Sequence, residues 1–308
     1  MSAHSSVTVR MAPPLSPSRA GLWWGLLGVT AFSFTVIFTR VAVEGLPALF
    51  IGSGRAVVAA LLAASALRLT RQARPRGRQW WRLAVVAAGV VLGFPLLTSY
   101  ALTTAPASHG AVVIALLPAA TALTVVVRTG ERPARSFWLF ALAGAVAAVV
   151  FAMLGSGGLG QVRLADLLLF GAVLAAAVGY AEGGLLSREL GSWQTVSWAL
   201  VVAAPVTTVL TAVALRAGAP HATGQQWAAF GYLCLVSMYL GFFAWYRGLA
   251  IGPMAQVSQV QLAQPVMSIL WAAGFLAEPL TAQTLAGGVA VVACAALTVR
   301  ARLSGRSG

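Results

Sequence analysis

The sequence predicts an all-α integral membrane protein with ten transmembrane helices, arranged as two inverted five-helix repeats. Three observations carry this prediction. Hydrophobic residues make up 59% of the chain and charged residues only 8%, whereas about 25% of the residues of a soluble domain are charged. Apolar stretches of roughly 20 residues, enough for a helix to cross a bilayer, fill almost the whole length. Finally, three residues of the first half recur in the second half at one constant offset.

Ten apolar segments are expected to form the membrane-spanning helices. They are long, continuous and rich in Ala, Leu, Val and Gly, unlike the short alternating strands of a membrane β-barrel. In chain order they cover residues 20–40, 46–67, 83–104, 108–127, 137–155, 165–186, 194–215, 227–248, 255–276 and 283–300. The two cysteines, Cys234 and Cys294, fall inside these segments, so we expect no structural disulfide.

The basic residues are all arginines, and their placement predicts the orientation of the chain. Sixteen of the twenty fall on one side of the ten-helix arrangement, three on the other, and Arg55 lies inside the second segment. Loops rich in Lys and Arg stay in the cytoplasm. We therefore expect a multi-pass protein of the inner (cytoplasmic) membrane with both termini in the cytoplasm. The arginines are expected to anchor the helices and attract anionic lipid, and the net charge of +14 does not indicate nucleic-acid binding.

An internal duplication organises the chain. Three residues are matched by identical residues 147 positions later: Pro106, Pro118 and Glu131 by Pro253, Pro265 and Glu278. The same offset superimposes segments 2 to 5 on segments 7 to 10. We expect a tail over 1–19, a first repeat over 20–155 and a second over 165–302. Because each repeat has five helices, the second enters the membrane from the opposite side. Such inverted repeats typically hold a solute site near the bilayer midplane and work by alternating access, although duplication can also serve only to build a stable bundle.

The stretch Tyr100–Pro133 reads YALTTAPASHGAVVIALLPAATALTVVVRTGERP. Its short turn, small-residue helix with an internal proline and closing Gly-Glu-Arg resemble the EamA-type repeat of the drug/metabolite transporter superfamily. The second copy, Trp245–Leu280, departs where Ala277-Glu278-Pro279 replaces Gly-Glu-Arg. Arg55 and Asp166 also stand where such proteins often carry these residue types. The resemblance implies a ten-helix bundle with cytoplasmic termini that exports, or less often imports, small metabolites such as amino acids.

Glu182 is the most informative side chain, because it lies inside the sixth segment. An ionisable group there usually faces a cavity or a partner. It could bind a substrate ammonium or carry a coupling proton, or it could form a structural ion pair or reach the nearby interface. Its repeat mate is Thr35, which we expect at the same interface. Arg55 is the candidate counter-charge, for Glu182 or for a substrate carboxylate, unless its head group reaches water at the outer interface.

A polar stripe marks the ninth segment. Ser258, Gln261, Pro265 and Ser268 share one helix face, and Gln264 borders it. Amides cannot face lipid unpaired, so this face should be buried or wet, either for hydrogen bonding between helices or for binding a polar solute. The corresponding face of the fourth segment is much less polar, so the predicted site is asymmetric.

Two tyrosines and two prolines complete the candidate residues. Tyr239 lies deep in the eighth segment and Tyr180 precedes Glu182, so either could line the cavity. Pro118 and Pro265 remove a helix hydrogen bond at equivalent places, and we expect paired kinks that could act as hinges.

The sequence shows no cofactor, metal or nucleotide motif and no cluster of catalytic residues, so we expect no enzyme. The sequence predicts a secondary-active transporter of a small polar metabolite and favours export over import. An amino acid, an amino-acid derivative or a metal-chelating metabolite would fit, with a proton as candidate coupling ion. The alternatives are an integral-membrane enzyme acting on lipid, and a non-transporting membrane sensor or assembly partner. Substrate, direction, coupling ion and oligomeric state are not readable from the chain.

Overall fold

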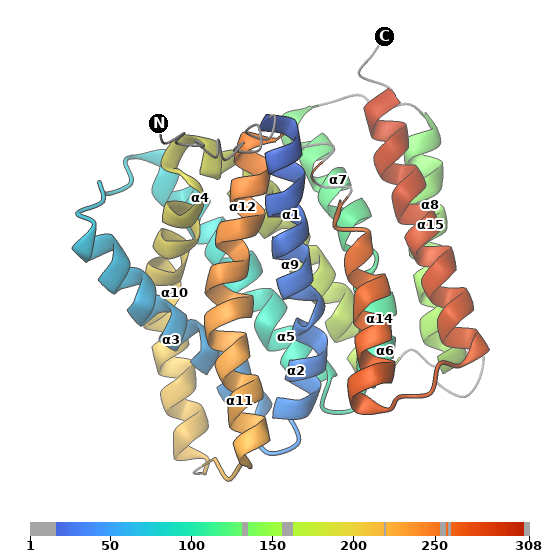
Figure 1. Cartoon of the computed structure of the whole chain (residues 1–308), viewed down its shortest axis with the longest axis horizontal. Coiled ribbons are helices and arrows are strands. Elements are labelled where there is room, and N and C mark those ends of the chain that lie inside the picture. The colour runs from blue at the N-terminus through green and yellow to red at the C-terminus, as the bar shows by residue number, and fades with distance from the viewer. Residues whose placement is uncertain are drawn as a thin grey trace, which may run out of the picture.

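The computed structural model describes residues 17–130, 135–155, 163–218, 220–252, 257 and 260–304, and these residues form helices and connecting turns without a strand (Figure 1). The first half contains α1 (Pro17–Ser33), α2 (Thr35–Ala42), α3 (Ala48–Leu69), α4 (Arg78–Val86), η1 (Ala87–Gly93), α5 (Phe94–Ala101), α6 (Ala107–Ile114), α7 (Leu117–Thr129) and α8 (Arg135–Gly155). The second half contains α9 (Leu164–Leu190), α10 (Ser192–Arg216), α11 (Gly224–Tyr232), η2 (Leu233–Leu240), α12 (Gly241–Ile251), α14 (Ala263–Leu276) and α15 (Ala282–Ser304).

These elements join into membrane-crossing segments. Within the described residues, seven helical stretches are long and apolar enough to cross a membrane: Ala20–Ala42, Ala48–Leu69, Arg78–Ala101, Ala107–Arg128, Leu164–Leu190, Ser192–Arg216 and Gly224–Ile251. Three shorter apolar helices, Arg135–Phe151, Ala263–Leu276 and Ala282–Thr298, occupy the positions of the fifth, ninth and tenth predicted segments. The predicted all-α integral membrane fold is confirmed, since each expected segment coincides with an apolar helix.

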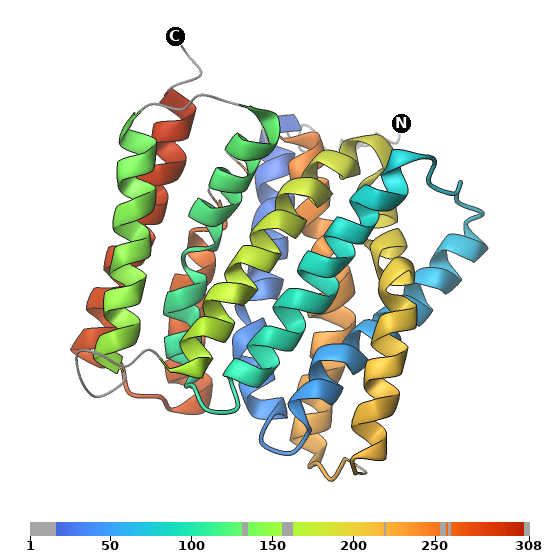
Figure 2. The ribbon, with the colours of Figure 1, turned by 180° about the vertical axis from the view of Figure 1, so that it is seen from behind.

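The two halves run through the bundle in opposite directions. Helix α1 begins at the same end of the bundle at which α15 finishes (Figure 1), whereas α9, the first helix of the second half, begins at the other end (Figure 2). We call the first of these the arginine-rich end, because it carries the turn from Thr70 to Gly77 and the last turns of α7 and α9. The other, which carries the turns before α3, α6 and α15, is called the far end.

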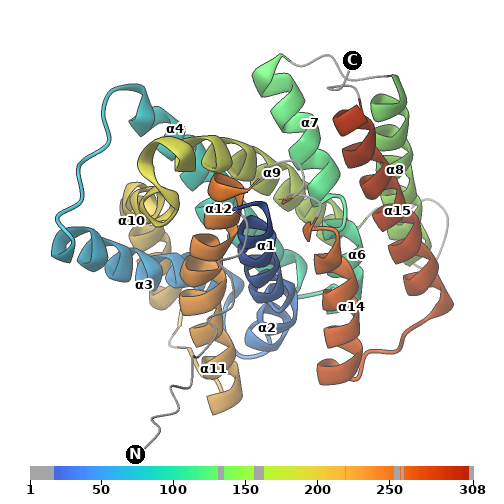
Figure 3. The same cartoon turned by 45° about the horizontal axis from the view of Figure 1, so that its top comes forward.

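Helix packing follows the repeat. Segment 1 packs along segment 8, as α1 on α12, and its mate segment 6 packs along segment 3, as α9 on η1 and α5. Segments 2 and 7 pair as α3 and α10, and segments 5 and 10 pair as α8 and α15. The latter pair stands at one side of the bundle (Figure 3). The centre is therefore built by helices from both halves.

The two π-helical segments occupy equivalent positions. Adding 147 to the bounds of η1, 87 and 93, gives 234 and 240, and η2 covers Leu233–Leu240. A π-helical turn widens the helix and is often found at functional sites. Its presence in both copies is a structural equivalence that the residue types alone did not reveal.

Three segments are interrupted. Segment 4 breaks between α6 and α7, where Pro118 is the second residue of α7, and a turn at Gln261 and Leu262 precedes α14, which contains Pro265. Proline cannot donate a backbone hydrogen bond and clashes with the preceding turn, so it favours a helix start. Their role as hinges stays a prediction. The third break, at Phe34 between α1 and α2, contains no proline and was not anticipated.

Helices α1 and α12 cross in close contact because glycines face each other. A Cβ atom added to Gly28 would lie 2.8 Å from the backbone nitrogen of Trp245, and one added to Gly248 would lie 2.7 Å from that of Gly25. Small residues let membrane helices approach closely and gain van der Waals contact. This crossing joins the first half to the second beside the central cavity.

Candidate functional site

A narrow cavity lies between the two halves of the chain. Elements α1 to α3, η1 and α5 supply its wall from the first half, and α9, η2, α12 and α14 supply it from the second. Its free volume is about 20 Å³, and one water molecule needs about 10–15 Å³ measured in this way. The lining residues are Phe32, Thr35, Val36, Arg55, Val90, Phe94, Pro95, Ala176, Tyr180, Ser237, Met238, Phe242 and Gln264.

Arg55 brings the charge to this cavity. Arg55 is 1% exposed, and its Nε and Nη2 atoms have no hydrogen-bond partner among the described residues. No carboxylate appears among the lining residues. The sequence left open whether Arg55 faces the interior or reaches water at the outer interface, and in the structure the residue is buried. A guanidinium group in a low-dielectric interior strongly favours an anionic partner.

Neutral polar groups share the cavity with Arg55. Gln264 is buried, and its Oε1 atom, an acceptor, has no hydrogen-bond partner in the part of the chain that the structure describes. The phenol ring of Tyr180 is stacked on Phe32 with ring centroids 6.2 Å apart, and it also contacts Phe242. The cavity therefore combines one fixed positive charge, amide and phenol groups, and aromatic walls.

Thr35 begins α2 at the break in segment 1, and its hydroxyl lies 2.8 Å from that of Ser237 in η2. The break is held on its other side by α14. Ser268 donates to the carbonyl oxygen of Ser33 at 2.7 Å, and the indole of Trp271 donates to the Ser33 hydroxyl at 3.0 Å. The Ser268 bond satisfies a backbone carbonyl at the break, which is how membrane proteins tolerate interrupted helices.

Other predicted residues lie outside the cavity wall. Tyr239 is buried against Phe243, and its hydroxyl lies 3.1 Å from that of Ser197, so it joins η2 to α10. Gln261 is buried in the turn before α14, with both amide atoms unpartnered, and is not a lining residue. Ser258 lies outside the described residues. The structure thus brings Thr35, Arg55, Tyr180 and Gln264 together.

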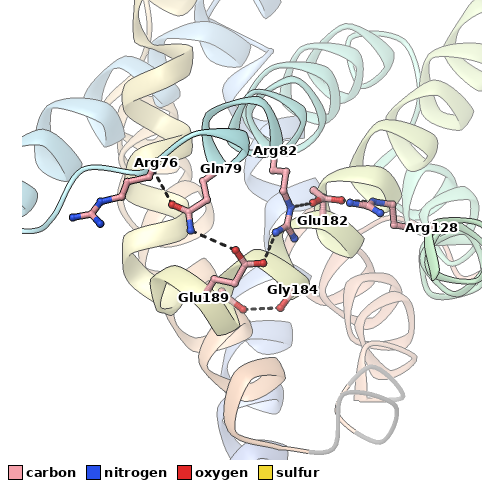
Figure 4. A network of polar contacts seen from close by, with 8 residues as sticks. Arg76, Gln79, Arg82, Arg128, Glu182, Gly184 and Glu189 are labelled. Carbon is pink, nitrogen blue, oxygen red and sulfur yellow. Dashed lines mark hydrogen bonds and ion pairs between the residues drawn. The ribbon is translucent and has the colours of Figure 1, made fainter.

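Glu182 belongs to a separate network towards the arginine-rich end (Figure 4). Its two carboxylate oxygens accept from Arg82 of α4 and from Arg128 of α7, the latter at 2.9 Å. Arg82 also contacts Glu189, which in turn accepts from Gln79 at 3.4 Å. The suggested pair between Arg55 and Glu182 is therefore not formed, and Glu182 does not meet Thr35. A cleft of about 660 Å³ lies beside this network.

At the far end a carboxylate of one half caps a helix of the other. The two oxygens of Glu278 each accept at 2.8 Å, from the backbone nitrogens of Ala107 and Ser108 at the start of α6. Glu278 thus lies at the N-terminus of a helix of the other half rather than at that of its own following helix, α15, and a carboxylate at a helix N-terminus is stabilising. Its repeat mate Glu131 lies outside the described residues.

Sequence reasoning missed several residues that build the site. Ser237, Phe32 and Phe242 line the cavity without a distinctive pattern, since serine and phenylalanine are common in membrane helices. The pairing of His109 with Asp166, whose Nε2 and Oδ1 atoms are 2.6 Å apart, was also missed. Each residue stands near the start of a predicted segment, but nothing in the sequence places the two starts side by side.

Comparison with known proteins identifies the family. The EamA-like transporter family matches residues 19–153 and again residues 163–300. The chain belongs to the EamA-like transporter family. An uncharacterized transporter of Bacillus subtilis (strain 168), YdeK, is 40% identical over 284 residues, which cover 90% of this chain and 96% of YdeK.

A solved crystal structure is also similar to this EamA-like transporter. It aligns over 94% of this chain and 99% of its own, with a TM-score of 0.64 and 19% identity, and shows that the fold is shared. The protein is thus a multi-pass membrane transporter with two EamA repeats, whose solute crosses a lipid bilayer. In the described part of this EamA-like chain, no three His, Cys, Asp or Glu side chains gather as metal ligands.

Proposed function

We propose that this protein is a secondary-active exporter of a small polar metabolite that carries a carboxylate, such as an amino acid, an amino-acid derivative or a metal-chelating metabolite. One observation carries the proposal: the buried guanidinium of Arg55 faces a cavity between the two repeats, and no carboxylate of the described residues neutralises it. An anionic group on the solute supplies the missing charge, and Arg is suited to bind a carboxylate with two parallel hydrogen bonds.

The rest of the cavity suggests the remainder of the solute. The unpartnered Oε1 of Gln264 can accept from an ammonium or hydroxyl group. Phe32, Phe94 and Phe242 provide surfaces for an apolar portion. A zwitterionic molecule with a carboxylate at Arg55, an ammonium group towards Gln264 and a short apolar side chain satisfies all three features.

The size of the cavity supports alternating access. A free volume of about 20 Å³ holds little more than a water molecule, so a metabolite enters only when helices around it separate. The interactions at the two ends fit this requirement: the Glu182 network ties α4, α7 and α9 at the arginine-rich end, and Glu278 ties the start of α6 at the far end. Breaking one set while keeping the other opens the cavity to one side only.

The proposed orientation places the arginine-rich end in the cytoplasm of the cell, with both termini there and the protein in the inner membrane. The excess of arginine at that end supports this direction. Labelling of intact cells with a membrane-impermeant maleimide tests it. We expect a cysteine introduced as Glu44→Cys in the far-end turn to react, and Arg76→Cys in the arginine-rich turn to react only after lysis.

Transport by purified protein in liposomes tests the function. A panel of labelled amino acids and derivatives should give uptake or counterflow for at least one carboxylate-bearing solute, and its decarboxylated amine should be transported far less. Arg55→Gln should lower transport about 10- to 100-fold, since a hydrogen bond to a charged group contributes about 1.5–3 kcal/mol. Arg55→Lys should recover part of it. Equal transport of acid and amine, or unchanged transport by Arg55→Gln, overturns the carboxylate assignment.

The same liposome assay tests whether transport is coupled to a proton. Glu182 is held by two arginines, which suits a structural ion pair more than a proton carrier. If a pH gradient drives accumulation of the solute with the wild-type protein and equally with Glu182→Gln, the coupling proton is carried by a residue other than Glu182. Failure of every solute to move, with folded protein, favours a lipid-modifying enzyme or a non-transporting membrane partner.

A further inference from the structure

A second cleft lies outside the transport pathway, where the arginine-rich turn meets α3, α4 and α10. Its volume is about 490 Å³. Arg68, Arg71 and Arg74 supply its charge, and the indoles of Trp80 and Trp198 stand beside them with ring centroids 5.7 Å apart. The complete lining consists of Ala64, Leu67, Arg68, Arg71, Gln72, Arg74, Trp80, Trp198 and Val201.

The three guanidinium groups of this cleft have no carboxylate partner among the described residues. In the part of the chain that the structure describes, Arg68, Arg71 and Arg74 form no ion pair. The carboxylates of Glu182 and Glu189 form their ion pairs with Arg82 and Arg128 instead. Three like charges around one cleft repel each other, so an anion bound between them stabilises the arrangement.

The backbone places one of these arginines at a cost. Arg71 has a φ of +49°, in the left-handed region that side chains other than glycine rarely adopt. Arg71 follows α3 in a Schellman motif. The backbone N–H of Arg71 donates to the carbonyl oxygen of Arg68, and the backbone N–H of Gln72 donates to the carbonyl oxygen of Leu67. Glycine normally occupies this position. An arginine here is unfavourable for the turn alone, which points to a role for its side chain.

The surface around the cleft selects between two sources of anion. Leu67 and Ala64 of α3 and Val201 of α10 form an apolar floor, and Leu61, three residues before Ala64 on α3, is an exposed apolar side chain. The tryptophans are of the kind that lies at the headgroup level of a bilayer. A free inorganic anion would gain nothing from this floor, whereas a phospholipid would lay an acyl chain along it.

We propose that this cleft binds the phosphate headgroup of an anionic phospholipid. Arg68, Arg71 and Arg74 hold the phosphodiester by charge-assisted hydrogen bonds, the indoles flank the glycerol region, and an acyl chain lies between α3 and α10. Those two helices are the second segments of the two repeats, so the lipid contacts both halves at once.

Mass spectrometry of the intact protein tests the proposal. The protein is released from detergent micelles after addition of phosphatidylglycerol, phosphatidylcholine or inorganic phosphate, and bound lipids are counted. We expect one phosphatidylglycerol to be retained preferentially. Each arginine removed should weaken retention of phosphatidylglycerol about fivefold. Arg71→Gly should therefore bind the lipid more weakly than the wild type, and the triple variant Arg68→Gln/Arg71→Gly/Arg74→Gln should bind it more weakly still. Arg76→Gln, in the same turn but outside the cleft wall, is the matched control and should bind as wild type.

Arg71→Gly separates binding from folding, because glycine relieves the left-handed strain. Its melting temperature in lipid-free detergent should equal or exceed that of the wild type while its lipid retention falls. Equal retention of phosphatidylcholine and phosphatidylglycerol overturns the proposal. So does displacement of the lipid by inorganic phosphate, or loss of the lipid in Arg76→Gln to the same extent as in Arg71→Gly.

Discussion

The side chains of Thr35 and Ser237 lie 202 positions apart in sequence, yet their hydroxyl oxygens are 2.8 Å apart across the interface between the repeats. Thr35 is the first residue after the break in segment 1, and Ser237 lies in the π-helical part of segment 8. The bond therefore joins two departures from regular α-helix, one from each half, at the wall of the central cavity.

We predict that this bond couples the two residues energetically. Thr35→Val and Ser237→Ala should each destabilise the protein by about 0.6 kcal/mol, typical of hydrogen bonds between membrane helices. The double variant should lose clearly less than the sum. A double-mutant cycle on unfolding in detergent measures the coupling, and strictly additive losses would contradict the bond.

We predict that Arg55 is needed for transport but lowers the stability of the protein. Because its charge is buried and forms no ion pair with a described residue, Arg55→Gln removes an unfavourable contribution of about 2.5–3.5 kcal/mol. The variant should therefore be as stable as the wild type or more so, while its transport falls. Thermal unfolding of the same preparations used for transport measures this. A marked loss of stability would show instead that Arg55 is held by the protein for structural reasons.

Glu182 should matter for stability more than Glu189 does. The Glu182 side chain is 7% exposed and binds two arginines, whereas that of Glu189 is 45% exposed. Removing one partner of a buried pair leaves the other charge uncompensated. We expect Glu182→Gln to cost about 1–3 kcal/mol, reduced from the fully buried case because the side chain of Arg128 is 51% exposed, and Glu189→Gln less than about 1 kcal/mol.

Chemical unfolding of these variants in detergent provides the comparison. Addition of Arg82→Gln to Glu182→Gln should restore part of the lost stability, because it removes a charge left without its main partner. A Glu182→Gln protein of wild-type stability that has lost pH-dependent transport would instead identify Glu182 as the proton carrier.

The crossing of α1 and α12 should tolerate no extra methyl group. In Gly248→Ala the new Cβ would meet the backbone of α1 at 2.7 Å, which forces the helices apart, and overpacking typically costs about 1–3 kcal/mol. Gly274→Ala is the matched control, since no atom lies within 4 Å of its added Cβ. The melting temperature should fall in the first variant and stay near wild type in the second.

The sequence by itself determined the helical membrane fold and the repeat. An apolar run of sufficient length has few choices in lipid, because every backbone polar group must be paired within its own segment. The ten segments could therefore be placed from composition and length. Among the site residues, Arg55, Thr35, Tyr180 and Gln264 could be nominated, since polar groups in apolar helices seek the interior.

Only the tertiary structure decided which of those polar groups meet. The sequence made Arg55 a candidate counter-charge for Glu182. In the structure, α4 and α7 bring Arg82 and Arg128 to Glu182, and Arg55 faces the cavity instead. Glu278 meets α6 of the other half rather than its own following helix. Pairing depends on the depth and rotation of each helix against its neighbours. Those are set by close packing between segments far apart in the chain, which no local pattern of residues records.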